Sequence, residues 1–222
     1  MPIILHIETA TKVCSVAVSC DGKLLSEREK AGTQDHASVL TLFIEDALRR
    51  AGIGLVQLDA VAVSGGPGSY TGLRIGVSTA KGLCCALDKP LIAVSTLHAL
   101  CFSPSLAAYC AERPEALLCP MLDARRDEVY TALFDENRNQ IKPVSAEIIN
   151  ENSFLQTEEK RGIIFFGSGA AKCKRLMSPS PDKIFAEHIE PSAANMIPLA
   201  EKAFAENFWA DTAYFEPLYL KD

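Results

Sequence analysis

A glycine-rich segment offers the most specific chemistry in this sequence: residues 64–76 read SGGPGSYTGLRIG. It joins a buried-type strand predicted at residues 60–64 to a helix predicted at residues 71–87. Such a turn presents backbone N–H groups beside the positive end of a helix dipole, which suits an anion such as phosphate. The spacing matches neither the Rossmann pattern nor the P-loop. The alternative is that the glycines only allow a tight turn with positive φ.

The predicted helix at residues 71–87 contains three glycines, and each costs on the order of 1 kcal/mol relative to alanine in a helix interior. Gly72, Gly76 and Ala80 are four residues apart, so they form one smooth ridge that lets a neighbouring helix approach closely. The neighbour is either the amphipathic helix predicted at residues 40–51 or a helix of another protein. We therefore expect this ridge to be a helix-packing surface.

Residue patterns for metal and nucleophile catalysis are missing. The four histidines never form H-x-x-x-H or H-E-x-x-H, so the helical pair that holds a catalytic metal is absent. Gly167-Ser168-Gly169 is shorter than a nucleophile elbow, which leaves a serine hydrolase without support. The eight cysteines include no C-x-x-C pair, and in a reducing compartment we interpret them as small buried hydrophobes. The sequence therefore predicts no catalytic residue and no metal ligand.

Composition narrows the class of protein. The chain has 222 residues, 48% of them hydrophobic, and a formal net charge of −6 with scattered basic residues. No basic stripe marks a phosphate-backbone footprint, so we expect no tight nucleic-acid binding by this chain alone. The N-terminal residues lack a signal-peptide pattern, and no apolar stretch reaches membrane-spanning length. We expect a cytoplasmic protein without membrane contact.

The predicted elements repeat once along the chain. The first half reads β-β-β-α-β-α-β, with strands at residues 3–8, 13–18, 24–28, 60–64 and 91–94. The second half begins in the same way, with strands at 117–123, 129–134, 144–149 and 162–166, and a final helix at 192–208. Such a repeat predicts two α/β lobes, each a mixed sheet with helices. We assign residues 1–101 to the first lobe and 102–222 to the second, leaving open that the C-terminal part packs back on the first.

Four segments resemble the bacterial TsaB proteins, also called YeaZ: ILHIETAT at residues 4–11, GPGSYTGLRIG at 66–76, MLDARRDEVY at 121–130 and PLYLKD at 217–222. The resemblance implies a two-lobed actin/hexokinase-like (ASKHA) fold. It also implies a partner, TsaD, that has the same fold and holds the catalytic metal. With the ATPase TsaE, the pair transfers threonylcarbamoyl to the tRNA adenosine 3′ of the anticodon.

The resemblance implies a non-catalytic scaffold subunit that binds TsaD directly. It would contact TsaE and tRNA only within the complex, and it would require no cofactor of its own. By this resemblance, partner contacts fall on the helices at residues 35–50 and 71–87, which pack as a four-helix contact with the matching helices of TsaD. From the glycine ridge itself, if it is exposed, we expect a homodimer when TsaD is absent, because the same apolar face would be covered in a symmetric dimer. The expected interface residues are Leu40, Phe43, Ala47, Tyr70, Thr71, Gly72, Leu73, Arg74, Gly76 and Ala80.

Nucleotide binding, at the level of the complex, would involve Thr9, Gly66, Gly68, Ser69, Gly167 and Gly169. Glu8 departs from the family pattern, in which an aspartate usually stands. Phosphoryl-transfer enzymes of the superfamily use that aspartate to handle magnesium, and glutamate is one methylene longer. The alternative hypothesis, an independent ATPase or small-molecule kinase, depends on this acid. A metalloprotease is a third hypothesis, but a protease needs a metal or a nucleophile, and this sequence has the residue pattern of neither.

Overall fold

The computed structural model describes residues 1–32, 35–154 and 161–220 and divides into two compact units. The first unit comprises Met1–Ala99 and Pro191–Tyr219, and the second is formed mainly by Leu100–Glu190. The second lobe therefore does not run from 102 to 222, because residues 191–219 pack back on the first unit. Of the C-terminal motif, Lys221 and Asp222 lie outside the described residues, as do Thr33 and Gln34 before the first helix.

The first unit is built on a five-stranded sheet in the order β3-β2-β1-β4-β5. β1 pairs antiparallel with β2 and parallel with β4, and β4 pairs parallel with β5. An Asp-Gly turn with positive φ at both residues joins β2 to β3, as the hairpin signal predicts. The strands are β1 (Ile3–Glu8), β2 (Cys14–Cys20), β3 (Lys23–Lys30), β4 (Ala60–Ser64) and β5 (Leu91–Val94).

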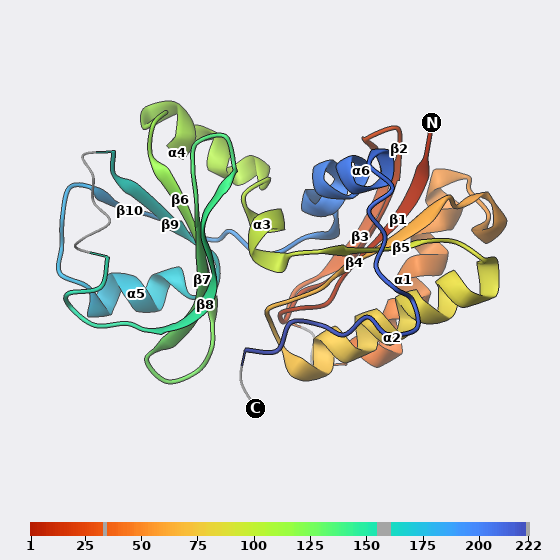
Figure 1. Ribbon diagram of the computed structural model, residues 1–222, viewed down its shortest axis with the longest axis horizontal. Coiled ribbons are helices and arrows are strands. Elements are labelled where there is room, and N and C mark those ends of the chain that lie inside the picture. The colour runs from red at the N-terminus through yellow and green to blue at the C-terminus, as the bar shows by residue number, and fades with distance from the viewer. Residues whose placement is uncertain (33–34, 155–160, 221–222) are drawn as a thin grey trace. The chain divides into compact units, whose positions relative to one another are not determined.

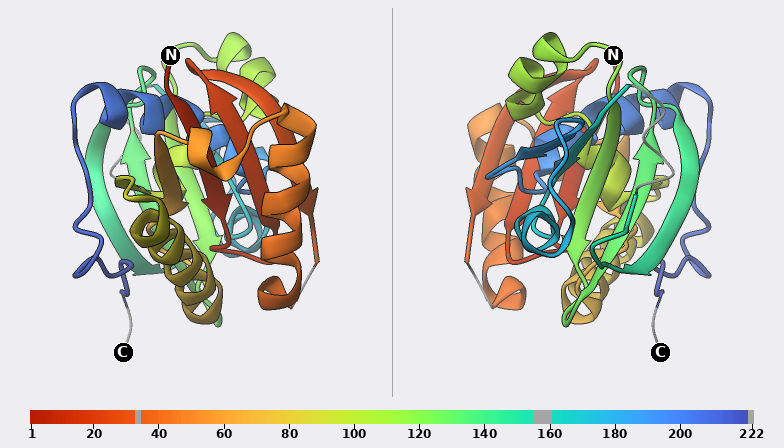
Figure 2. Two further views of the ribbon diagram at one scale, coloured as in Figure 1. Left: turned by 90° about the vertical axis from the view of Figure 1, so that its right-hand side faces the viewer. Right: turned by 90° about the vertical axis from the view of Figure 1, so that its left-hand side faces the viewer.

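Helices cover both faces of this sheet (Figures 1 and 2). Helices α1 (His36–Ala51) and α2 (Tyr70–Leu87) share one hydrophobic cluster with the β1 residues Leu5 and Ile7. Helix α6 (Ile197–Ala205) packs with Ile4 on the opposite face, as the alternation of side chains along a strand requires. A short 3-10 turn at Ala193–Met196 precedes α6, so the helix predicted at 192–208 is shorter than expected.

The second unit repeats the strand order, β10-β9-β6-β7-β8, around a second five-stranded sheet. Helix α5 packs on it through Ala170, Cys173 and Met177. The strand β10 was not predicted. The elements of this unit are α4 (Ala107–Glu112), β6 (Leu117–Asp123), β7 (Glu128–Phe134), β8 (Gln140–Ile148), β9 (Ile163–Phe166), α5 (Ala170–Leu176) and β10 (Lys183–Ala186), with a 3-10 turn at Pro104–Leu106. The first unit also contains a 3-10 turn at Leu55–Gln57 and most of α3 (Thr96–Leu100), at the boundary between the units.

None of the described helices combines the length and the apolar character that a membrane crossing needs. The cysteines are all free, and five are buried, as predicted from their spacing: Cys14, Cys84, Cys101, Cys119 and Cys173. Cys85, by contrast, is exposed.

Candidate functional site

The carboxyl end of β1 carries an acid that is closed off from solvent. Glu8 is fully buried, and its Oε1 accepts a 2.6 Å hydrogen bond from the Ala10 N–H. Its Oε2 has no hydrogen-bond partner among the described residues. Burial disfavours the charged form and raises the pKa of Glu8 to about 7. The carboxyl group is fully enclosed, so a magnesium ion, which retains several waters, would need this enclosure to open before it could bind.

Two histidines of the first unit, His6 and His36, make contacts within the lobe. His6 is fully buried on the same face of β1, and burial lowers its pKa to about 3, so its ring is neutral. Its Nε2 lies 2.8 Å from Ser19 Oγ. His36, at the start of α1, places Nε2 2.9 Å from the Thr11 carbonyl oxygen. Among the residues that the structure describes, no three His, Cys, Asp or Glu side chains gather as a metal site.

The glycine-rich turn between β4 and α2 packs on the chain's own backbone. The Ser69 N–H donates a 2.6 Å hydrogen bond to the Ala10 carbonyl oxygen, and Ser69 Oγ caps α2 by accepting from an N–H of its first turn. A Cβ at Gly68 would lie 2.4 Å from the Ala10 oxygen. Gly66 has a φ of +98°, and a Cβ there would lie 2.9 Å from the Leu218 oxygen. Tight packing thus accounts for both glycines, and nucleotide contacts here stay a prediction.

The small-residue ridge of α2 faces the residue that follows β1. A Cβ at Gly72 would lie 2.1 Å from the Thr9 carbonyl oxygen, and one at Gly76 would lie 2.2 Å from Thr9 Oγ1. The Thr9 hydroxyl donates to the Gly72 carbonyl oxygen at 2.8 Å. Ala80 is buried in the cluster that α1 and α2 share. The interpretation of this ridge as a contact with another protein is therefore wrong, because the chain's own first lobe covers it.

The burial of the predicted interface residues divides them into two groups. Tyr70, Thr71 and Arg74 are exposed on the outer face of α2, and Phe43 is half-buried. The other six are buried in their own lobe, so as single side chains they cannot meet a partner: Leu40, Ala47, Gly72, Leu73, Gly76 and Ala80. Only the first group remains a candidate docking surface.

A groove of about 470 Å³ runs along the exposed face of α2 next to α1. Tyr70 is 57% exposed at its edge. Arg74 donates to the Tyr70 hydroxyl at 3.0 Å, and its guanidinium lies 5.3 Å from the Tyr70 ring centroid. The remaining lining residues are Ala37, Thr71, Ile75, Ser78 and Thr79. We call this surface the α1/α2 face. Its aromatic, arginine and small polar side chains suit a protein contact.

Sequence reasoning missed four of these lining residues: Ala37, Ile75, Ser78 and Thr79. The signal was present, because Tyr70, Arg74 and Ser78 recur four residues apart, as do Thr71, Ile75 and Thr79. These two rows occupy the side of α2 that the glycine ridge leaves free.

In the second unit, Gly167 and Gly169 also serve packing. A Cβ at Gly167, where φ is +95°, would lie 2.4 Å from the Met121 carbonyl oxygen, to which the Gly169 N–H donates at 3.0 Å. Lys172 Nζ lies 2.7 Å from Asp123 Oδ1 and donates to the carbonyl oxygens of Arg126 and Glu128. These contacts tie α5 to the connection between β6 and β7.

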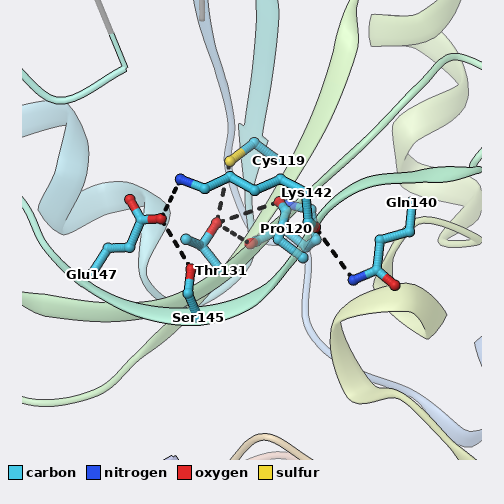
Figure 3. A network of polar contacts seen from close by, with 8 residues as sticks. Cys119, Pro120, Thr131, Gln140, Lys142, Ser145 and Glu147 are labelled. Carbon is cyan, nitrogen blue, oxygen red and sulfur yellow. Dashed lines mark hydrogen bonds and ion pairs between the residues drawn. The ribbon is translucent and has the colours of Figure 1, made fainter.

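A network of polar contacts in the second unit joins residues of its sheet (Figure 3). The buried Thr131 hydroxyl donates to the Pro120 carbonyl oxygen at 3.0 Å and lies 3.3 Å from Cys119 Sγ. On the edge strand β8, Glu147 accepts from Lys142 at 2.5 Å and from a neighbouring serine. These contacts link neighbouring strands of the second sheet.

Relatives of known name match almost the whole chain. The chain matches the family described as "TsaD: tRNA N6-adenosine threonylcarbamoyltransferase" over residues 24–222. It is 31% identical to the tRNA threonylcarbamoyladenosine biosynthesis protein TsaB of Escherichia coli K12, over 99% of this chain and 94% of that protein. The chain belongs to the TsaB family.

Solved structures of YeaZ relatives share this fold of two α/β lobes, each a mixed sheet with helices. YeaZ from Pseudomonas aeruginosa is 28% identical with a TM-score of 0.82, covering 99% of this chain and 100% of that one. A shorter stretch of 83 residues is 47% identical to the tRNA N6-adenosine threonylcarbamoyltransferase of Novosphingobium aromaticivorans, covering 37% of this chain and 24% of that enzyme. TsaB proteins are named for tRNA threonylcarbamoyladenosine biosynthesis, and this chain is thereby assigned to that process.

Proposed function

We propose that this chain is a non-catalytic subunit that binds and supports TsaD during threonylcarbamoyl transfer to the tRNA adenosine 3′ of the anticodon. The α1/α2 face carries the proposal: an exposed tyrosine and arginine border a groove between two helices of the first lobe. Aromatic residues and arginine supply much of the binding energy of protein interfaces. TsaE and tRNA would meet this subunit only within the complex.

Similarity to the enzyme itself supports the choice of partner. The chain matches the TsaD family over most of its length, so TsaD is expected to have the same strand order and an equivalent helix pair. Two proteins with equivalent helix pairs can associate about an approximate two-fold axis, giving a four-helix contact. The same geometry allows two copies of this chain to pair when TsaD is absent.

The environment of Glu8 supports a non-catalytic role. Kinases and ATPases of this superfamily need a charged acid at the end of the first strand to handle magnesium. Here the acid is buried, is easily protonated and accepts a backbone hydrogen bond. An independent ATPase or kinase would therefore need this enclosure to open before the first-strand acid could reach magnesium and its waters. We expect no turnover by the isolated chain and no cofactor requirement of its own.

Titration of cognate TsaD with wild type and an Arg74→Glu variant tests the proposal. Reversing this exposed charge on the α1/α2 face should weaken binding at least about tenfold. The matched control is Arg175→Glu, which changes an exposed arginine on α5 of the second unit and should bind like wild type. Gly76→Leu is unsuitable, because the added side chain would enter the space that Thr9 fills.

Two results would contradict the proposal: equal TsaD binding by wild type and Arg74→Glu, or ATP-dependent turnover by the purified chain alone. Light scattering supplies a further check. We expect a homodimer that gives way to the heteromer on addition of TsaD, whereas a strict monomer before and after addition would refute the shared-face geometry.

A further inference from the structure

Residues 208–219 form a strap along the first unit (Figure 1). The Ala210 N–H donates to the Leu91 carbonyl oxygen at 2.8 Å, in an isolated antiparallel bridge with β5. The Leu218 N–H donates to the Gly65 carbonyl oxygen at 2.8 Å. Both ends of the strap are thus bonded to backbone at the sheet and at the glycine-rich turn.

A lysine of α2 holds the middle of the strap. Lys81 Nζ donates to the carbonyl oxygens of Ala213 at 2.9 Å and Phe215 at 3.2 Å. The Phe215 ring fills the space beside Gly65 and joins the cluster under α1 and α2. These contacts fix the course of the strap beside α2.

The strap ends at the α1/α2 face. The Tyr219 and Tyr70 ring centroids lie 4.9 Å apart, with 46° between the ring planes. Tyr70 also accepts the Arg74 hydrogen bond, and Arg74 lies over its ring. Tyr219 and Arg74 therefore both contact the Tyr70 ring at the rim of the groove, and we call these three residues the Tyr70 cluster. The sequence shows no sign of the contact between Tyr70 and Tyr219, because 149 positions separate the two residues.

The contacts within the Tyr70 cluster should affect binding by ordering side chains in advance. An exposed tyrosine and arginine on one helix face would otherwise sample several rotamers, and ordering them on association weakens binding. The contact between the two tyrosine rings and the cation–π contact favour one arrangement before a partner arrives. Preorganised aromatic and arginine side chains are the residues that interfaces use most effectively.

We propose that the strap is part of the docking surface and that Tyr219 is a positioning residue, which holds Tyr70 and Arg74 in the arrangement that TsaD recognises. This inference rests on the proposed function, because it assigns a new element to the same face. Lifting the strap would weaken association even though α1 and α2 stay folded.

The test compares TsaD affinity for wild type, Tyr219→Ala, Tyr70→Ala and the double variant. Tyr219→Ala should weaken binding about three- to tenfold, because it removes the ring contact with Tyr70 and lets the Tyr70 and Arg74 side chains sample more rotamers. The matched control is Tyr214→Ala, on the same strap with its side chain 83% exposed, and it should bind like wild type. Because Tyr219 acts through Tyr70, its effect should nearly vanish in the Tyr70→Ala background.

Three outcomes would overturn the inference: wild-type affinity of Tyr219→Ala, an equal loss in Tyr214→Ala, or losses at Tyr219 and Tyr70 that simply multiply. A measurement without TsaD separates this inference from the proposed function. In the free chain, Tyr219→Ala should shift the NMR signals of the Tyr70 ring and Tyr214→Ala should not. A wild-type chain that fails to bind TsaD refutes the proposed function, and unchanged Tyr70 signals refute the positioning role.

Discussion

The three glycines of α2 should respond in opposite ways to the same substitution. Gly82 is exposed, and nothing lies within 4 Å of a Cβ built there. Gly82→Ala should therefore stabilise the chain by about 1 kcal/mol, the difference in helix propensity between glycine and alanine. Gly76→Ala gains the same propensity, but its Cβ would lie 2.2 Å from Thr9 Oγ1. The balance between these two effects decides its sign.

The clash at Gly76 should outweigh the gain in propensity. Thr9 is fully buried and its hydroxyl donates to the Gly72 carbonyl oxygen, so it cannot turn aside freely. Overpacking of this kind costs about 1–3 kcal/mol. With a clash at the upper end of that range, Gly76→Ala should lower the free energy of unfolding by about 2 kcal/mol. In a chain of this length, that corresponds to a melting temperature lower by about 4–8 °C.

A double-mutant cycle identifies the clashing atom. Thr9→Ala removes Oγ1 and leaves the Thr9 Cβ 3.4 Å from a Cβ at Gly76, close to an ordinary contact. In that background Gly76→Ala should become stabilising, which gives a coupling energy of about 3 kcal/mol. Gly72→Ala should stay destabilising there, because its Cβ would meet the Thr9 backbone oxygen at 2.1 Å.

Urea unfolding measures all these variants, with unchanged m values required for the comparison. A Gly76→Ala variant as stable as Gly82→Ala would refute the packing of α2 against Thr9. It would also restore the interpretation of the glycine ridge as a surface open to a partner. Equal rescue of Gly72→Ala by Thr9→Ala would show that the clash is not with the backbone.

Two further predictions concern the buried acid and the second unit. Glu8→Gln keeps the acceptor for the Ala10 N–H but removes the ionisation. Because the folded pKa of about 7 lies above the ordinary 4.5, wild-type stability should fall as the pH rises from 4.5 to 7. The variant should therefore gain about 2–3 kcal/mol on wild type between pH 5 and pH 8, and parallel unfolding curves would contradict this. Lys172→Met removes three hydrogen bonds from a side chain that is 13% exposed, so it should destabilise the chain by about 2 kcal/mol. Lys174→Met breaks only a solvent-exposed pair with Glu187 and should cost at most about 0.5 kcal/mol; equal losses would show that Lys172 does not hold the β6–β7 connection.

Local patterns in the sequence were sufficient for most of the fold. Alternation and flanking turn residues predicted the strands at 3–8, 60–64, 91–94 and 117–123 with the bounds observed. The repeat of element order predicted two units, and both sheets have the same strand order. The four-residue strand β10 was missed, because it begins with a lysine and lacks the continuous apolar run that indicated the equally short β5.

The candidate site was predicted less well, because the sequence does not show which side of a helix is covered. The spacing of Gly72, Gly76 and Ala80 indicated close packing correctly but left the neighbour open. The neighbour is Thr9, 63 positions before the first of these glycines. The predicted residues Tyr70, Thr71 and Arg74 do lie on the exposed face, where burial leaves them free for a partner.

The sequence by itself determined the strands, the helices, the repeat and the family, because each depends on local periodicity or on a contiguous motif. Tertiary structure alone decided that the glycine ridge is internal, that Glu8 is enclosed and easily protonated, and that the Tyr219 ring contacts the Tyr70 ring. All three depend on contacts between segments far apart in the chain or on exclusion of water. Long-range contacts and exclusion of water produce no periodic pattern in the sequence.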